Sequence, residues 1–399
     1  MTSDHREDGD GSRQHLLAGS IANAGEPISF DEVGQIDGFA GSSANKGQEV
    51  KVFTRLALTS DEPSFHHIAN SIAHMIRAWV SRQPVAFDVS DYKFVLLRLK
   101  PDKTAELWLD TAAVALKCIA ARDVVAGAAV FQPEIADLIS MEFPCVEFGK
   151  QDKVLCLFRQ AWGFGLAFDM NPSGDLNMEA FNRELGRLYR QLNFRHLYDV
   201  VGDPESLDKL MACGWFPFVE ILHREFADIL AHHADGLVLD EVESSIVATF
   251  DQARLDHMLS RWMQKPHFEV KKALLSECIE AFIQRRPIAA IKILVTEIEG
   301  ILNGAYRALY GKAGKTKALL AFAIESAEAR TGGSGTLFLT TEFNRYLLNY
   351  TFASYDPDNL KEGTVSRHLV GHGDAASESY TLVKALQVIL TLDQLAFYT

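Results

Sequence analysis

The distribution of apolar and polar residues changes twice along the chain. Residues 1–46 are rich in Asp, Gly, Ser and Asn and contain few large apolar side chains. Such a segment buries too little surface to offset the entropy lost on ordering, so we expect a mostly disordered tail with a short contact at 27–30. Residues 47–200 alternate short apolar runs with turn residues, and helical spacing dominates the rest of the chain.

Alternating apolar positions predict strands in residues 47–200. The expected strands are 92–100, 105–110, 145–148, 154–158 and 163–169. Pro101-Asp102-Lys103-Thr104 separates the first two and suits a hairpin with a four-residue loop, and we expect the third and fourth to form a second hairpin. Pro63 begins a helix with apolar residues at spacings of three and four. Residues 47–200 are therefore predicted to form an antiparallel α+β domain.

Apolar residues three and four positions apart predict that the rest of the chain is almost wholly helical. The expected helices are 178–192, 203–214, 219–230, 240–262, 268–283, 288–310, 316–327, 340–352 and 380–397. We assign residues 201–238 to a helical connector and residues 239–399 to an all-α bundle. The predicted fold class is α+β, with an N-terminal antiparallel α+β domain followed by this C-terminal helical bundle.

Composition restricts the function classes. The formal net charge of −14 disfavours a protein that coats DNA or RNA through a broad basic face. Five scattered cysteines without a C-x-x-C pair favour free thiols over disulfides or a zinc site, and no metal or cofactor is expected. The first residues lack the apolar core of a signal peptide, and no run of about eighteen apolar residues suggests a membrane span. We expect a cytoplasmic protein.

Two motifs suggest chemistry that their context does not favour. Gly311-Lys-Ala-Gly-Lys-Thr316 resembles a phosphate-binding loop, but Leu309 stands where that motif needs glycine and a predicted helix precedes it. A turn between helices with solvated lysines is the better interpretation. Glu297 and Glu299 are two positions apart on a predicted helix and so do not face each other. One of them is a candidate partner for a cation such as Arg367, and the other is expected to be solvated.

The segment Ser366-Arg-His-Leu-Val-Gly-His-Gly-Asp374 places a guanidinium and two imidazoles within six positions. Arginine fits phosphate oxygens, and histidine exchanges protons near neutral pH. An arginine followed by a histidine at similar spacing also occurs at Arg190 and Arg261, so spacing alone is weak evidence. The polar His368, the two glycines and the apolar run that follows distinguish this segment. The glycines make a regular helix doubtful, and the alternative interpretation is a loop that caps the last helix.

The same segment and the helix after it resemble the R-polar-x3-H motif of HEPN-domain proteins, including the Apea-like branch, where this motif precedes the last helix. Residues 297–302 are similar to an acidic helix of that branch, and the resemblance covers about residues 239–399. It implies a HEPN-like bundle in which Arg367 and His372 are catalytic and His368 is the polar position. It also implies a homodimer whose two motifs face each other.

The resemblance implies a metal-independent endoribonuclease of the toxin or phage-defence kind, with RNA as substrate. Some HEPN proteins are non-catalytic, so the alternative is a binding or scaffold protein in which Arg367 and His372 are structural. A nuclease needs both side chains exposed, with cations such as Arg330 or Arg345 close by. A scaffold would bury Arg367 against Glu297 or Glu299.

Overall fold

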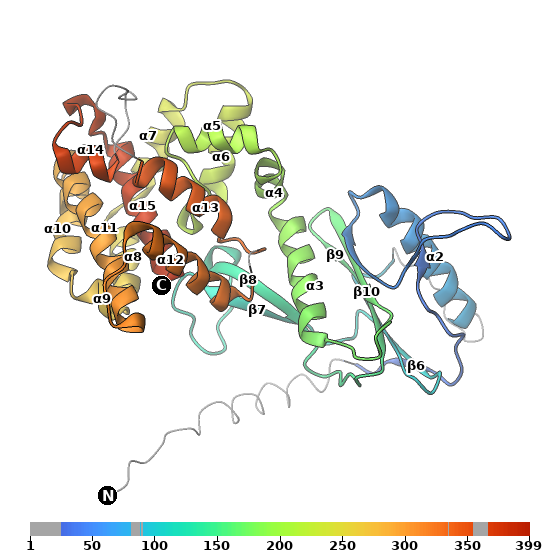
Figure 1. Cartoon of the computed structure of the whole chain (residues 1–399). Coiled ribbons are helices and arrows are strands. Elements are labelled where there is room, and N and C mark those ends of the chain that lie inside the picture. Colours follow the sequence, from blue (N-terminus) through green and yellow to red (C-terminus); the bar gives the residue numbers. More distant parts are fainter. Residues whose placement is uncertain (1–24, 81–87, 89–90, 334, 354–365) are drawn as a thin grey trace, which may run out of the picture. The chain divides into compact units, whose positions relative to one another are not determined.

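A computed structural model describes residues 25–80, 88, 91–333, 335–353 and 366–399 (Figure 1). The chain divides into two compact units. The first unit comprises residues 1–118 and 138–195, and the second, which we call the helical unit, comprises 119–137 and 196–399. The fold class is α+β, with a sheet in the N-terminal part and helices in the C-terminal part.

The first unit is built on a six-stranded antiparallel sheet with the strand order β1-β6-β5-β9-β10-β4. Its strands are β1 Ile28–Phe30, β4 Arg55–Thr59, β5 Phe94–Leu99, β6 Ala105–Leu109, β9 Lys153–Gln160 and β10 Gly163–Asp169. Two small sheets pair β2 Phe39–Ala40 with β3 Val52–Phe53, and β7 Ala115–Ala120 with β8 Ile135–Glu142. Each unit includes part of β7 and part of β8.

Helices cover both faces of the six-stranded sheet. Alternate residues of a strand point to opposite faces. Thus Leu97 of β5 packs in the core under helix α2 (Pro63–Val80), whereas Leu96 packs in the core under helix α3 (Met178–Asn193). Figure 1 shows α2 and α3 on the two sides of the sheet. Burial on both faces explains the unbroken apolar runs 94–97 in β5 and 154–158 in β9.

The observed elements of the first unit match the sequence predictions in part. The hairpin of β5 and β6, the helix that starts at Pro63 and the strand at 163–169 are confirmed. The predicted hairpin of 145–148 with 154–158 is wrong, because β9 pairs with β5 and β10, and 145–148 contains no strand. The structure also differs from a disordered tail at residues 25–46. Phe30 and Phe39 are buried in the core under α2, and β1 pairs with β6.

From α4 onwards, the described residues of the helical unit form helices with two short 3₁₀ turns and one π-helical turn between them. Its other segment, residues 119–137, contains parts of β7 and β8 and a further 3₁₀ turn, Gln132–Glu134. The helices are α4 Arg195–Val201, α5 Pro204–Ala212, α6 Arg224–Ala234, α7 Asp240–Thr249, α8 Gln252–Trp262, α9 Pro266–Glu269, α10 Lys272–Ile283, α11 Pro287–Tyr310, α12 Thr316–Thr331, α13 Thr340–Tyr346, α14 Arg367–His372 and α15 Leu382–Tyr398. The 3₁₀ turns are Val219–Ile221 and Ser377–Ser379, and the π-helical turn is Leu347–Thr351. No helix of the described residues is long and apolar enough to cross a lipid bilayer.

Helix α15 is the centre of the helical unit. Every residue from Ala385 to Tyr398 is buried, because α7, α8, α11 and α12 pack around the helix. The apolar run near the C-terminus is therefore a core helix, as its composition indicates. Thr381 caps the start of α15 by accepting a hydrogen bond from the backbone N–H of Lys384 (3.2 Å).

One long helix predicted at 240–262 is wrong, since the structure divides it into α7 and α8. Apolar residues continue at helical spacing across the break, which made the two helices look like one. Asp251 causes the break. The first helix ends at Thr249, and the extended Asp251 caps the second, its carboxylate accepting a hydrogen bond from the N–H of Arg254 (2.9 Å).

Candidate functional site

Helix α14 carries all three residues of the candidate motif. Ser366 precedes the helix in an extended conformation, and its hydroxyl accepts a hydrogen bond from the N–H of Leu369 (3.3 Å). Gly373 ends the helix with a φ of 82°, a left-handed conformation that glycine adopts without strain. The expectation that the glycines prevent a regular helix here is wrong. Gly371 lies inside α14, and Gly373 is its C-terminal cap.

Arg367 begins α14 and pairs with Glu299 of α11. Its Nη2 forms an ion pair with Oε2 of Glu299. The Arg367 side chain is 32% exposed and that of Glu299 is 19% exposed. Glu299 is thus the acidic residue that holds Arg367, while Glu297 pairs with Lys271 (2.7 Å). One carboxylate fixes the direction of the guanidinium, which still has further N–H donors.

The two histidines differ in exposure. His368 is half-buried in the first turn of α14, and His372 is exposed at its last position. Four residues separate them, so they lie on one side of the helix. Arg367 and His372 are five residues apart, which corresponds to about 7.5 Å along the axis and about 140° around it. The helix alone does not bring their functional groups together.

Glu299 has a second partner, Thr316, at the start of α12. The hydroxyl of Thr316 donates to Oε1 of Glu299 (3.3 Å), while Arg367 occupies Oε2. One carboxylate therefore connects α14 with the turn between α11 and α12. That turn contains Gly311 to Lys315, so the prediction of a turn between two helices at this segment is confirmed.

The other proposed cations contact different parts of the helical unit. Arg330 donates to the carbonyl oxygen of Phe397 at the end of α15 (2.5 Å). Arg345 forms an ion pair with Asp208 of α5 (3.3 Å). These contacts give neither residue a defined role beside Arg367.

A second group of charged side chains surrounds Glu220 and Asp393 in the interior of the helical unit. Arg261 bridges the two carboxylates, at 3.1 Å and 2.6 Å, and Arg254 also pairs with Glu220 (3.0 Å). Burial raises the pKa of Asp393. Burial acts on Glu220 in the same direction, but the positive charges of Arg261, Arg254 and Arg122 hold its pKa below the usual value. Both carboxylates are buried and paired, so the group connects elements of the fold.

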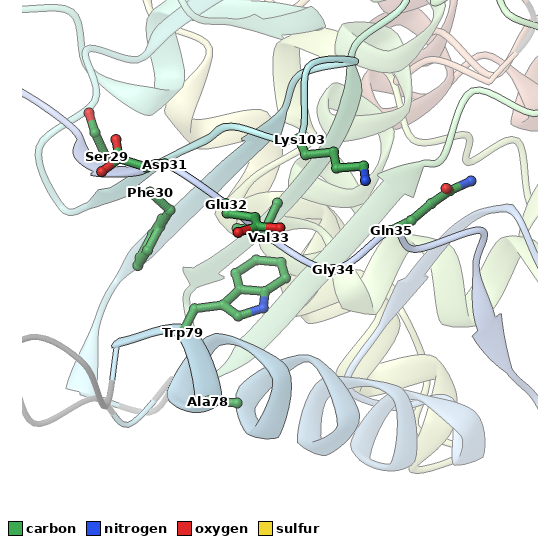
Figure 2. Close-up of a pocket in the computed structure, with 10 residues that line it drawn as sticks. All are labelled: Ser29, Phe30, Asp31, Glu32, Val33, Gly34, Gln35, Ala78, Trp79 and Lys103. Atoms are coloured by element: carbon green, nitrogen blue, oxygen red, sulfur yellow. The ribbon is translucent and has the colours of Figure 1, made fainter.

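A pocket of about 820 Å³ in the first unit is the alternative location for a ligand (Figure 2). It is lined by residues 29–35, Ala78, Trp79 and Lys103, and Figure 2 shows the indole of Trp79 beside the segment that carries Glu32 and Val33. Asp31 and Glu32 contribute two negative charges against the one positive charge of Lys103. This balance disfavours a phosphate group, which leaves α14 as the better candidate for phosphate chemistry.

Comparison with family models, curated proteins and solved structures finds no match to this chain. Within the described part of the chain, no group of three or more His, Cys, Asp or Glu side chains is arranged to hold a metal ion. Helix α14 and its neighbours are therefore the candidate functional site of the described residues. Sequence reasoning named Arg367, His368 and His372 and restricted the partner of Arg367 to Glu297 or Glu299. It missed the contact between Thr316 and Glu299.

Proposed function

We propose that this protein is a metal-independent endoribonuclease of the toxin or phage-defence kind, which acts in the cytoplasm through Arg367 and His372. One observation carries the proposal. Glu299 fixes a partly exposed Arg367 at the start of α14, and an exposed His372 ends the same capped helix. An oriented guanidinium and an accessible imidazole are the two groups that phosphodiester cleavage without a metal requires.

The reaction divides into two roles. The imidazole of His372 removes the proton of a ribose 2′-hydroxyl, or returns a proton to the departing 5′-oxygen. The 2′-oxygen attacks the adjacent phosphorus and the bond to the 5′-oxygen breaks, which leaves a 2′,3′-cyclic phosphate and a 5′-hydroxyl. Arg367 stabilises the negative charge that builds on the phosphate oxygens. DNA lacks the 2′-hydroxyl and would not be cut. His368 is the polar helper, one turn from His372.

The separation between Arg367 and His372 favours a homodimer as the active form. The two residues lie on different sides of α14. One copy of the helix can therefore bring both to a single phosphate only if the Arg367 side chain is fully extended. Two copies associating through the helical unit would place one α14 opposite the other. A complete site would then contain residues of both copies.

A non-enzymatic binding or scaffold function is the second candidate, and the ion pair of Arg367 with Glu299 favours it. The carboxylate neutralises the guanidinium, as expected for an arginine whose role is to connect α14 to α11. The two functions differ in one measurable respect. A scaffold needs the ion pair and has no need of the exposed His372.

The test is cleavage of a mixed RNA pool by the full-length protein in EDTA. We compare wild type with Arg367→Ala, His372→Ala and a control, His257→Ala, which removes another exposed histidine of the helical unit. Cleavage by wild type and the control, with at least about a hundredfold loss in both motif variants, is expected. His372→Ala should barely change the melting temperature, because an exposed side chain contributes little packing.

Two results would contradict this proposal, one the nuclease activity and the other the catalytic role of His372. One is no cleavage by a wild-type protein confirmed to be dimeric, across several RNAs. The other is a His372→Ala variant that remains folded and fully active. The first result would favour the scaffold, and the second would remove His372 from the mechanism.

A further inference from the structure

Four positively charged residues follow one another at the junction of α11 and α12. They are Arg307, Lys312, Lys315 and Lys317, and we call residues 307–317 the basic loop. No acidic residue occurs between Glu299 and Glu325, although the whole chain has a net charge of −14. The basic loop is therefore a local exception to the acidic composition, and local charge decides which ligands approach a site.

The cations of the basic loop are available to a ligand. All four side chains belong to exposed residues. Among the residues that the structure describes, none of the four forms an ion pair with a carboxylate. Their positive charge is not compensated by the fold, so it favours a polyanionic partner.

The basic loop is attached directly to the candidate site. Thr316 lies between Lys315 and Lys317, and its hydroxyl donates to the same Glu299 that holds Arg367. A ligand bound along the lysines would therefore continue towards the start of α14.

Local contacts hold the loop in one shape. The N–H of Gly314 donates to Oδ1 of Asn303, one turn after Glu299 on α11 (3.0 Å). A Cβ atom at position 314 would lie 2.7 Å from Cδ2 of Leu319, so any larger residue there would have to displace the Leu319 side chain. The lysines extend from a fixed turn, and ordering them on a ligand does not require the backbone to fold.

An aromatic side chain lies within the basic loop, between Arg307 and Lys312. Tyr310 is 47% exposed, and its ring centroid lies 4.5 Å from that of Tyr306. Cations interspersed with an accessible aromatic ring are typical of surfaces that bind single-stranded nucleic acid. The cations contact the phosphates, and a base stacks on the ring.

We propose that the basic loop binds the backbone of single-stranded RNA and directs it to α14, with Tyr310 stacking on one base. The part of this inference that concerns delivery to Arg367 and His372 rests on the proposed nuclease function. Binding itself does not, and it can be measured without cleavage. The surface spans one turn and two helix ends, so it is compatible with a chain that does not coat nucleic acid.

The experiment measures binding of a fluorescein-labelled single-stranded RNA of mixed sequence by anisotropy, in full-length protein carrying His372→Ala so that the RNA stays intact. The test variant adds Lys312→Gln, Lys315→Gln and Lys317→Gln. The matched control adds Lys46→Gln, Lys117→Gln and Lys272→Gln, which removes the same charge from three other exposed lysines. Each titration is repeated at several salt concentrations.

The test variant should bind at least about tenfold more weakly, and its slope of log affinity against log salt should decrease by about 2, since each phosphate contact contributes about 0.7. The control should remain within about twofold of the parent. In a third variant, Tyr310→Ala should weaken binding about tenfold without changing the slope. Unchanged binding in the test variant, or an equal loss in test and control, would overturn the proposal.

The two proposals fail differently. If wild type binds RNA through the basic loop but cleaves nothing, the binding surface stands and the nuclease falls. If wild type cleaves RNA and the three loop substitutions, made with His372 intact, leave kcat and KM unchanged, the nuclease stands and the basic loop has no part in it.

Discussion

Glu299 is the residue on which the meaning of Arg367 depends. Its carboxylate receives the guanidinium on one oxygen and the hydroxyl of Thr316 on the other. A carboxylate beside a phosphate-binding arginine has two opposite effects, because it orients the side chain and also competes with the phosphate. If orientation of the guanidinium dominates, α14 is a working site. If competition with the phosphate dominates, α14 is a structural contact.

Substitution of Glu299 separates orientation from competition. Glu299→Gln keeps the size of the side chain but replaces a charge-assisted hydrogen bond with a neutral one. If orientation dominates, kcat for RNA cleavage should fall about tenfold, equivalent to about 1.4 kcal/mol, while RNA binding is unchanged or tighter because a negative charge is removed. The measurement is steady-state cleavage together with anisotropy.

Glu297→Gln is the matched control for this variant. It removes the same charge two positions away on α11, where the partner is Lys271. Its kcat should remain within about twofold of wild type. A Glu299→Gln protein that cuts faster than wild type would show that the carboxylate competes with phosphate and would contradict its role in orienting Arg367.

At the scale of the element, α14 is a helix of six residues, too short to be stable by itself. Its two caps, Ser366 and Gly373, and its contacts with α11 hold it in place. Because both motif residues are on this helix, its geometry determines where Arg367 and His372 point. The N-terminal cap should therefore influence activity without contacting RNA.

Ser366→Ala tests the N-terminal cap. Loss of the hydroxyl leaves the N–H of Leu369 without its side-chain acceptor, and the free energy of unfolding should decrease by about 1 kcal/mol. Thr381→Ala removes the equivalent cap of α15 and should cost a similar amount. Well below the melting temperature, cleavage should fall several-fold only in Ser366→Ala. Equal cleavage by the two variants would show that the order of α14 is not limiting.

Sequence reasoning succeeded for elements that local signals define. Pro63 with its apolar spacing and the loop at 101–104 gave α2 and the β5–β6 hairpin. Sequence reasoning failed where an element depends on residues that are far away in the sequence. The pairing of β1 with β6 depends on positions about 75 residues apart, and residues 145–148 form no strand because β9 pairs with β5 and β10. The break between α7 and α8 was locally visible in Asp251, but apolar spacing continues across it and concealed it.

In the candidate site too, sequence reasoning succeeded for neighbouring residues and failed for contacts between distant ones. The residues Arg367, His368 and His372 could be named because they are adjacent in sequence. The sequence restricted the partner of Arg367 to Glu297 or Glu299 but could not choose between them. The two carboxylates differ only in the direction in which they project from α11. Thr316 was noticed within a motif that predicts different chemistry. The lack of acidic residues from 300 to 324 was the signal that could have identified the basic loop.

At the scale of the whole molecule, the interior of the helical unit contains a histidine that makes stability depend on pH. His267 follows the first residue of α9, is half-buried, and contacts the hydroxyl of Thr399 through Nε2 (2.9 Å). Burial, together with the positive charge of Lys265, lowers the pKa of His267 to about 4. Lys265 in turn donates to the carbonyl oxygen of Thr399 (2.5 Å), and Arg330 adds a second positive group at the same helix end.

The sign of the effect follows from the direction of the shift. Between pH 6.5 and pH 4 the unfolded chain binds a proton at this histidine and the folded chain does not, so stability is fully present above pH 6.5 and is lost as the pH falls towards 4. Because the ring is partly exposed, we expect this loss to be about 1–2 kcal/mol.

The check is urea unfolding of wild type and His267→Gln, followed by helical circular dichroism at pH 7.5, 5.5 and 4.5. Carboxylates contribute to the pH dependence of both proteins, so the difference between them isolates His267. The variant should lose about 1–2 kcal/mol less than wild type between pH 7.5 and 4.5. Parallel curves for the two proteins would mean that His267 becomes protonated in the folded state without cost. The positive groups around Thr399 would then not disfavour the protonated, charged form of His267.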